Sequence, residues 1–230
     1  MSSLLRRGWQ AVLDLVFPDG NVCQLCGQPL QHEHEIWLCD PCDADLQAAA
    51  IPPSDQPLFI DPAIPCAVAA FAYGSVAQEL VHNLKYRSAA AAVGPLALGM
   101  ARAFAEASSG ALLQADVLIP IPLHPKRKRE RGYNQSELLS QQLSLHIGIP
   151  SQPHALERIR NTKTQVSTAP GRRTQNVAGA FVVADIPLIY QKRVLLIDDV
   201  CTSGATSIAC AQVLLACGAK EVALITACRA

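Results

Sequence analysis

One stretch of the sequence decides the fold: Val194-Leu195-Leu196-Ile197-Asp198-Asp199-Val200-Cys201-Thr202-Ser203-Gly204-Ala205-Thr206. Its four leading apolar residues predict a buried strand, and a helix is expected from Thr206 to Ala216. The start of a helix presents unpaired backbone amides and the positive end of the helix dipole, which suit a phosphate group. Thr202 and Ser203 add hydroxyl donors, and Gly204 lets the backbone close around an anion.

Asp198 and Asp199 stand between the predicted strand and this turn. Carboxylates repel phosphate, but they accept hydrogen bonds from ribose hydroxyls, so a ribose 5-phosphate satisfies both halves of the stretch. An Asx turn and a capped helix would explain single residues of the string. They would not explain two acids, two hydroxyls, a glycine and a threonine together. The stretch therefore predicts a ribose 5-phosphate site at the carboxyl end of a strand.

The rest of the C-terminal part alternates between predicted strands and helices. Apolar runs predict strands at 67–73, 117–121, 180–184, 194–197 and 222–226, and helical periodicity predicts helices at 76–86, 89–107, 134–146 and 206–216. The helix at 89–107 is expected to bend near Gly94-Pro95. Alternation with nearly continuous apolar strands indicates an α/β fold with a parallel-rich sheet flanked by helices on both faces.

The N-terminal part has a different composition. Apolar residues at helical spacing predict a helix at 3–17, two CxxC pairs follow at 23–42, and five prolines lie within 51–65. We therefore expect three regions: a helix and cysteine module at 1–50, a proline-rich linker at 51–65, and an α/β domain at 66–230.

Cys23, Cys26, Cys39 and Cys42 form the two CxxC pairs. Four thiolates at this spacing predict a closed, tetrahedral and structural zinc site, with an iron–sulfur cluster or a redox dithiol as alternatives. His32 lies between the pairs and could replace one thiolate, as could His34. The other five of the nine cysteines are interpreted as small buried apolar residues.

A second cluster of charge lies between the strand at 117–121 and the helix at 134–146. Residues 126–131 carry five bases and one acid, a local charge of +4 in a chain with 19 residues of each sign. The position after a strand favours a loop that clamps pyrophosphate or contacts nucleic-acid phosphates, over a merely solvated charge run. Lys85 ends the helix at 76–86, where its charge complements the helix dipole, although a ligand contact is the alternative.

The stretch 194–206 resembles the phosphoribosyl pyrophosphate signature of type I phosphoribosyltransferases. The whole chain resembles the ComF/GntX family of competence-associated proteins, in which a cysteine-rich finger precedes a phosphoribosyltransferase domain. The resemblance implies that Asp198 and Asp199 hold the ribose hydroxyls, directly or through Mg²⁺, and that residues 202–206 hold the 5-phosphate. It implies ligand binding by Asp198, Asp199, Val200, Cys201, Thr202, Ser203, Gly204, Ala205 and Thr206, and by Arg131, Gly132, Tyr133 and Asn134 at the pyrophosphate-loop position.

Residues 156–179 are polar and lack a clear period. In type I transferases this region is a flap that closes over the substrate and excludes water. Lys163 and Arg172 are predicted to act as catalytic charges there, together with Asp198 and Asp199.

Two functions follow from these patterns. The first is a Mg²⁺-dependent phosphoribosyltransferase that uses phosphoribosyl pyrophosphate, for which no acceptor motif is visible. The second is a non-catalytic competence factor that senses phosphoribosyl pyrophosphate or binds single-stranded DNA. The zinc module could also dock a protein partner. No run is apolar enough to span a membrane, and the CxxC pattern favours a reducing compartment, so we expect a cytoplasmic protein.

Overall fold

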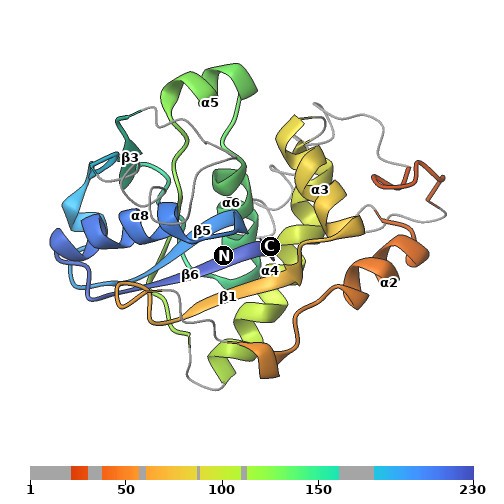
Figure 1. The fold of residues 1–230 in the computed structure, drawn as a ribbon, viewed down its shortest axis with the longest axis horizontal. Coiled ribbons are helices and arrows are strands. Elements are labelled where there is room, and N and C mark those ends of the chain that lie inside the picture. Colours follow the sequence, from red (N-terminus) through yellow and green to blue (C-terminus); the bar gives the residue numbers. More distant parts are fainter. Residues whose placement is uncertain (1–21, 31–37, 57–60, 87–88, 110–112, 161–178) are drawn as a thin grey trace.

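The computed structural model describes residues 22–30, 38–56, 61–86, 89–109, 113–160 and 179–230. Its centre is a four-stranded parallel sheet with strand order β1-β6-β5-β2. The strands are β1 (Ala67–Ala72), β2 (Val117–Pro120), β5 (Arg193–Cys201) and β6 (Glu221–Arg229). β5 is the strand predicted from the stretch 194–206, and it lies inside the sheet between β6 and β2 (Figure 1).

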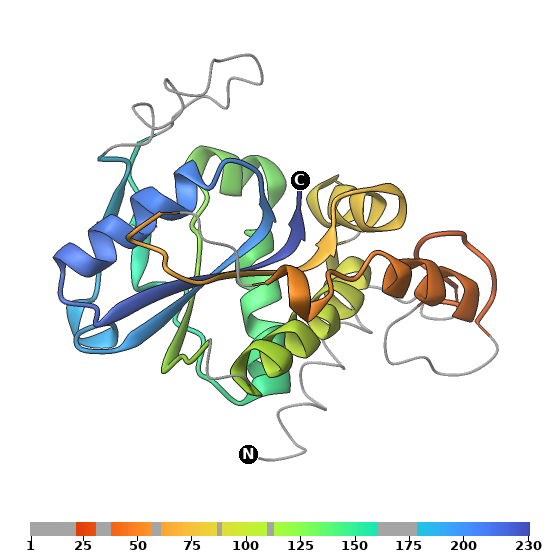
Figure 2. The same cartoon turned by 60° about the horizontal axis from the view of Figure 1, so that its bottom comes forward.

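Helices cover both faces of this sheet (Figure 2). The helices α4 (Ala89–Ser109) and α6 (Gln135–Ile147) pack on one face, and α8 (Ala205–Ala216) packs on the other. α3 (Ser75–Tyr86) packs beside α4. The expected α/β architecture is confirmed.

Alternate residues of β5 enter two different hydrophobic cores. Leu195 and Ile197 pack with the α3, α4 and α6 side, whereas Val194 and Leu196 pack with the α8 side. All four side chains are buried. A strand buried on both faces needs apolar residues at every position, which is why its sequence reads as a continuous apolar run.

Two predicted elements differ from the structure. Residues 126–131, interpreted as a loop, lie in a short helix, α5 (Pro125–Arg131). The strand predicted at 180–184 is β4 (Phe181–Val183), which does not belong to the parallel sheet. It pairs in antiparallel fashion with β3 (Leu156–Arg158), a strand that the sequence did not predict. With only three residues, β3 gives too little periodicity to be assigned from sequence.

The cysteine-rich segment contacts the α/β part directly. Cys23, Leu38 and Leu46 are buried in the same core as α3 and α4. Leu46 lies on α2 (Asp40–Ala48), which runs beside α3 in Figure 2. The helix predicted at 3–17 lies outside the described residues.

The proline-rich segment also touches the sheet. It contains a 3₁₀ turn, η1 (Pro53–Asp55), and the Gln56 side chain bonds both backbone groups of Ala69 on β1 at 3.0 and 3.1 Å. A second 3₁₀ turn, η2 (Ile186–Leu188), precedes β5. Within the described ranges, no helix combines the length and the apolarity needed to cross a membrane.

Candidate functional site: an acid pair at the end of β5

Asp198 and Asp199 lie near the carboxyl end of β5, one strand position apart. The chain then turns through Thr202 and Ser203, both exposed, into α8. Gly204 precedes the helix with φ +69°, in the left-handed region that favours glycine. The strand, the two acids, the left-handed glycine and the helix start thus form one continuous unit, as the sequence predicts.

Asp198 is held from α6 and from its own backbone. Its Oδ1 accepts hydrogen bonds from Ser136 Oγ at 3.0 Å and from the Asp199 amide at 2.9 Å. Burial and the neighbouring charge of Asp199 raise the pKa of the Asp198 carboxyl to about 8. Sequence reasoning missed Ser136, since nothing in the chain marks this serine as a partner of a residue so distant in sequence.

Asp199 is almost fully buried, with 5% of its surface exposed. Its Oδ1 accepts the Val200 amide hydrogen at 2.8 Å, and its Oδ2 lies 2.7 Å from Lys85 Nζ. Burial lowers the pKa of Lys85, but the adjacent Asp199 carboxylate outweighs burial and raises it. Lys85 is therefore charged and forms an ion pair with the Asp199 carboxylate, so Lys85 does more than complement the dipole of α3.

The segment 131–134 forms the turn between α5 and α6. Gly132 ends α5 with φ +86°. Tyr133 donates its hydroxyl hydrogen to the carbonyl of Leu84 at 2.7 Å, and Asn134 caps α6 by accepting the Ser136 amide hydrogen. The side chains of Tyr133 and Asn134 are thus engaged within the chain, and their predicted contact with a ligand stays a prediction.

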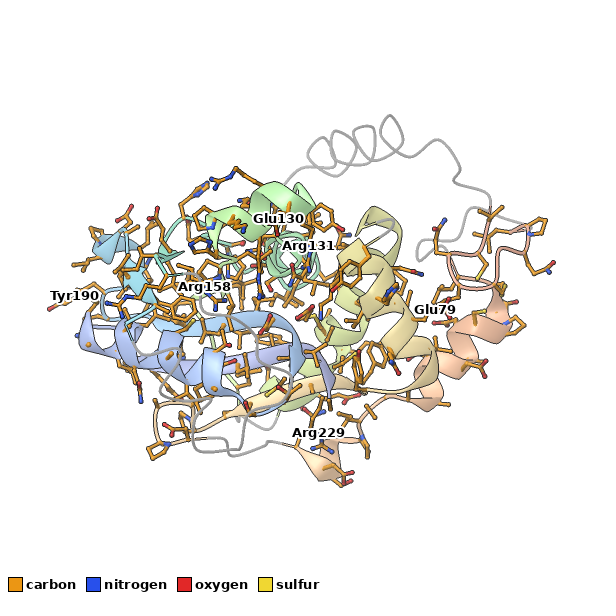
Figure 3. The ribbon with its side chains drawn as sticks, turned by 45° about the horizontal axis from the view of Figure 1, so that its top comes forward. Glu79, Glu130, Arg131, Arg158, Tyr190 and Arg229 are labelled. Atoms are coloured by element: carbon orange, nitrogen blue, oxygen red, sulfur yellow. The ribbon has the colours of Figure 1, made fainter. Side chains whose placement is uncertain are left out.

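The bases of α5 form ion pairs as well as facing solvent. Lys128 Nζ lies 2.9 Å from Glu137 Oε2, and Lys126 Nζ lies 4.0 Å from Glu130 Oε1. Arg131 lies between α5 and α3, as Figure 3 shows, with its guanidinium 5.5 Å from the centre of the Tyr86 ring.

Arg158, on β3, lies close enough to α5 and to the acid pair for their charges to change its pKa. Burial and the nearby Arg127 lower its pKa. Its guanidinium lies 5.3 Å from the centre of the Phe181 ring. Lys163 and Arg172, the predicted flap charges, lie outside the described residues, so their catalytic role stays a prediction.

The four predicted cysteine ligands converge. The sulfur atoms of Cys23, Cys26, Cys39 and Cys42 all lie within 4.8 Å of one another. Zn–S bonds of about 2.3 Å in a tetrahedron require sulfurs roughly 3.8 Å apart, and Cys26 and Cys39 are separated by 3.6 Å. Burial raises the pKa of the Cys23 thiol, but backbone hydrogen bonds from Cys26 and Cys39 outweigh it and bring the value to about 6. The donor set therefore fits a zinc ion.

Comparison with known proteins identifies the fold around the acid pair. A family profile described as the phosphoribosyl transferase domain matches residues 95–230, more than half of the chain. The chain belongs to this family. The matched residues include the acid pair, the left-handed Gly204 and the whole of α8.

Similar proteins indicate which branch of the phosphoribosyl transferase family the chain belongs to. The chain is 32% identical over 213 residues to the DNA utilization protein YhgH of Escherichia coli K12, covering 92% of this chain and 85% of that protein. It is 38% identical over 111 residues to competence protein F of Haemophilus influenzae, covering 46% of this chain but only 47% of that protein. Competence protein ComFC of Bacillus subtilis is 26% identical over 198 residues, covering 85% and 72%. The chain is thus a ComF-like member of the phosphoribosyl transferase family.

Among solved structures, the chain resembles glutamine phosphoribosylpyrophosphate amidotransferase from B. subtilis, complexed with ADP and GMP. The sequence identity is 20% and the TM-score is 0.40, and the match covers 64% of this chain and 30% of the amidotransferase chain.

Proposed function

We propose that the chain binds phosphoribosyl pyrophosphate and is a Mg²⁺-dependent phosphoribosyltransferase. One observation carries this proposal: two carboxylates on β5 lead directly into the left-handed Gly204 and the start of α8. The carboxylates provide acceptors for the ribose hydroxyls, and the amides at the start of α8 suit the 5-phosphate. Membership of the phosphoribosyl transferase family supports the same ligand.

In the proposed reaction, the bond between ribose C1 and a pyrophosphate oxygen breaks, and the pyrophosphate leaves with the bonding electron pair. A lone pair of the acceptor forms the new bond to C1, and the acceptor releases its proton. Mg²⁺, when bound, neutralises charge on the pyrophosphate. The residues of the chain orient the ribose at the acid pair and hold the phosphate at α8, so most of the rate acceleration comes from positioning and charge stabilisation.

The basic helix α5 supplies positive charge beside this site. Lys126, Arg127, Lys128, Arg129 and Arg131 precede the α5–α6 turn, at the position expected for pyrophosphate binding. The names of the relatives link them to competence and DNA utilization, and we propose a role in handling external DNA. The aromatic side chain of this segment, Tyr133, is hydrogen-bonded to Leu84, which makes it a poor stacking platform for single-stranded DNA.

We also propose that the four cysteines hold one structural zinc ion. The sulfur spacing fits a tetrahedral ion, and a closed set of four thiolates leaves no position for a substrate. The zinc would therefore support the fold and take no part in the transfer reaction.

Calorimetric titration with phosphoribosyl pyrophosphate and Mg²⁺ tests the proposed function. We expect the wild type to bind and Asp199→Asn to weaken binding by roughly ten- to a hundredfold, the size of a lost charge-assisted hydrogen bond. Asp198→Asn should weaken binding less, by roughly threefold, because its raised pKa keeps this carboxyl protonated at neutral pH and only a neutral hydrogen bond is changed. Asp185→Asn, which changes an exposed aspartate in the loop before η2, is the matched control and should bind like the wild type.

Two further outcomes separate binding from catalysis. Release of pyrophosphate in the presence of nucleobases or single-stranded DNA supports the transferase. Binding without release for every acceptor supports the non-catalytic sensor. Equal affinity of the wild type and both asparagine variants would refute the site.

A further inference from the structure

The Asp199 carboxylate contacts one backbone group and one side chain, and only the side chain can be removed by substitution. Its Oδ1 accepts a hydrogen bond from the backbone amide of Val200, which no side-chain substitution removes. Its Oδ2 lies against the ammonium of Lys85. A buried carboxylate without a counter-ion is costly, so the position of Asp199 depends on the Lys85 charge.

The position of Lys85 depends on the last turn of α3, and the residues on either side of Lys85 in sequence are both held there by other parts of the chain. The carbonyl of Leu84 accepts the Tyr133 hydroxyl hydrogen at 2.7 Å. The ring of Tyr86 stacks under the Arg131 guanidinium. Both contacts come from the end of α5 and the turn that follows it, and Figure 3 shows Arg131 in the space between α5 and α3.

The same turn of α3 also contacts the cysteine module, because Asn83 Nδ2 donates to the backbone carbonyl of Gln24 at 3.4 Å. Gln24 lies between Cys23 and Cys26. Residues 83–86 thus contact three separate parts of the chain in succession, which fixes the backbone from which the Lys85 side chain extends.

We propose that Lys85 is a positioning residue of the phosphoribosyl pyrophosphate site, acting through the Asp199 carboxylate, and that Tyr133 sets its place. This inference rests on the proposed function and adds two roles to it. Lys85 holds Asp199 Oδ2 where it accepts a ribose hydroxyl, and the Tyr133 hydroxyl serves α3 instead of the ligand.

A double-mutant cycle with phosphoribosyl pyrophosphate and Mg²⁺ tests this role. We expect Lys85→Met to weaken binding by about tenfold and Lys85→Arg, which keeps the charge, to restore it to within about threefold. In an Asp199→Asn background, Lys85→Met should change the affinity less than about twofold, because a residue that acts through Asp199 has nothing left to position. Tyr133→Phe should cost about threefold, the size of one hydrogen bond.

Lys220→Met is the matched control. Lys220 is exposed in the turn before β6, at the amino ends of the parallel strands, whereas the acid pair lies near their carboxyl ends, and this variant should bind like the wild type. Circular dichroism and melting curves confirm that each variant is folded, and Lys85→Arg and Tyr133→Phe still test the role if Lys85→Met does not fold.

Each result decides between named alternatives. Wild-type affinity in Lys85→Met overturns the role of Lys85 and leaves the proposed function standing. Fully additive losses in the cycle overturn positioning, because they indicate that Lys85 contacts the ligand independently of Asp199. A wild-type protein that binds no phosphoribosyl pyrophosphate overturns the proposed function, and this inference with it.

Discussion

The raised pKa of Asp198 makes the stability of the protein depend on pH. Its pKa in the folded protein is about 8, well above its ordinary value of 3.8, because the site is buried and Asp199 is charged. Between these values the folded protein holds a proton that the unfolded chain has released. Stability therefore decreases as the pH rises from about 4 to about 8, in proportion to this difference in bound protons.

Asp198→Asn removes that proton. Relative to the wild type, we expect the variant to gain stability as the pH rises from about 4 to about 8, by at most about 1.4 kcal/mol per pH unit. Urea unfolding at several pH values measures the difference. Parallel stability curves for the wild type and the variant would contradict the elevated pKa.

Asp116 provides the matched control, because its shift has the opposite sign. Hydrogen bonds from the side chain and the backbone of Arg193 lower the pKa of Asp116 to about 2. Ionised Asp116 therefore contributes to the stability of the folded protein above about pH 4, and this contribution is lost as the pH falls toward 2. Asp116→Asn should therefore leave the slope between pH 4 and 8 unchanged.

The residues of the acid-pair unit could be predicted from sequence because they are contiguous. Asp198, Asp199 and Gly204 lie within one strand, turn and helix start, so local chemistry relates them. Lys85 and Ser136 could not be predicted as their partners. Each reaches the acid pair only because α3 and α6 both pack near the carboxyl end of β5, and no short stretch of sequence indicates that packing.

At the scale of elements, α5 was predictable and β3 was not. α5 has a capping histidine at His124, a proline at its first position and a left-handed glycine, Gly132, after its end. The proline and the glycine are standard signals for helix boundaries, but histidine is not a usual N-cap and the density of charge favoured interpretation as a loop. β3 has only three residues, Leu156–Arg158, and its pairing with β4 supplies the order that its sequence does not specify.

The described part of the cysteine module has few buried apolar residues of its own. Within the described part of the module, Cys23, Leu38 and Leu46 are buried apolar residues, which is little for a self-supporting core. Zinc bound to four thiolates contributes on the order of 10 kcal/mol to folding such a module. We expect one zinc per chain in the purified protein and a melting temperature several degrees lower after chelation.

Two serine substitutions separate metal binding from the loss of a thiol. Cys26→Ser should lose the zinc and melt early, because Cys26 belongs to the cluster. Cys217→Ser changes a cysteine outside the cluster, at the end of α8, and should retain both zinc and melting temperature. Metal analysis with melting curves measures both, and full stability of the metal-free wild type would contradict a structural ion.

At the scale of the whole molecule, one sheet separates two hydrophobic cores, and the side of α3, α4 and α6 also takes in the cysteine module. The sequence conveys this arrangement well because each central strand must be apolar throughout. It conveys the packing distances between layers poorly, since these depend on pairs of residues from different elements. Gly99 of α4 and Phe71 of β1 are one such pair of residues, and they lie in contact.

Gly99 lets α4 approach the sheet closely. A Cβ added at Gly99 would overlap Cζ and Cε2 of the Phe71 ring, which is 1% exposed and has little room to move. Alanine gains about 1 kcal/mol in helix propensity, but overpacking a core costs about 1–3 kcal/mol. We therefore expect Gly99→Ala to lower the melting temperature by about 2–4 °C, corresponding to about 1 kcal/mol.

The cause of that loss can be isolated by a second substitution. Phe71→Leu removes the ring atoms that the added methyl group would meet, so Gly99→Ala should be neutral or stabilising in that background, a coupling expected only between residues in contact. Gly74→Ala is the control, since an added Cβ there has no atom within 4 Å and the backbone is not left-handed. An equal loss from Gly99→Ala with phenylalanine or leucine at position 71 would show that this contact does not set the distance between α4 and the sheet.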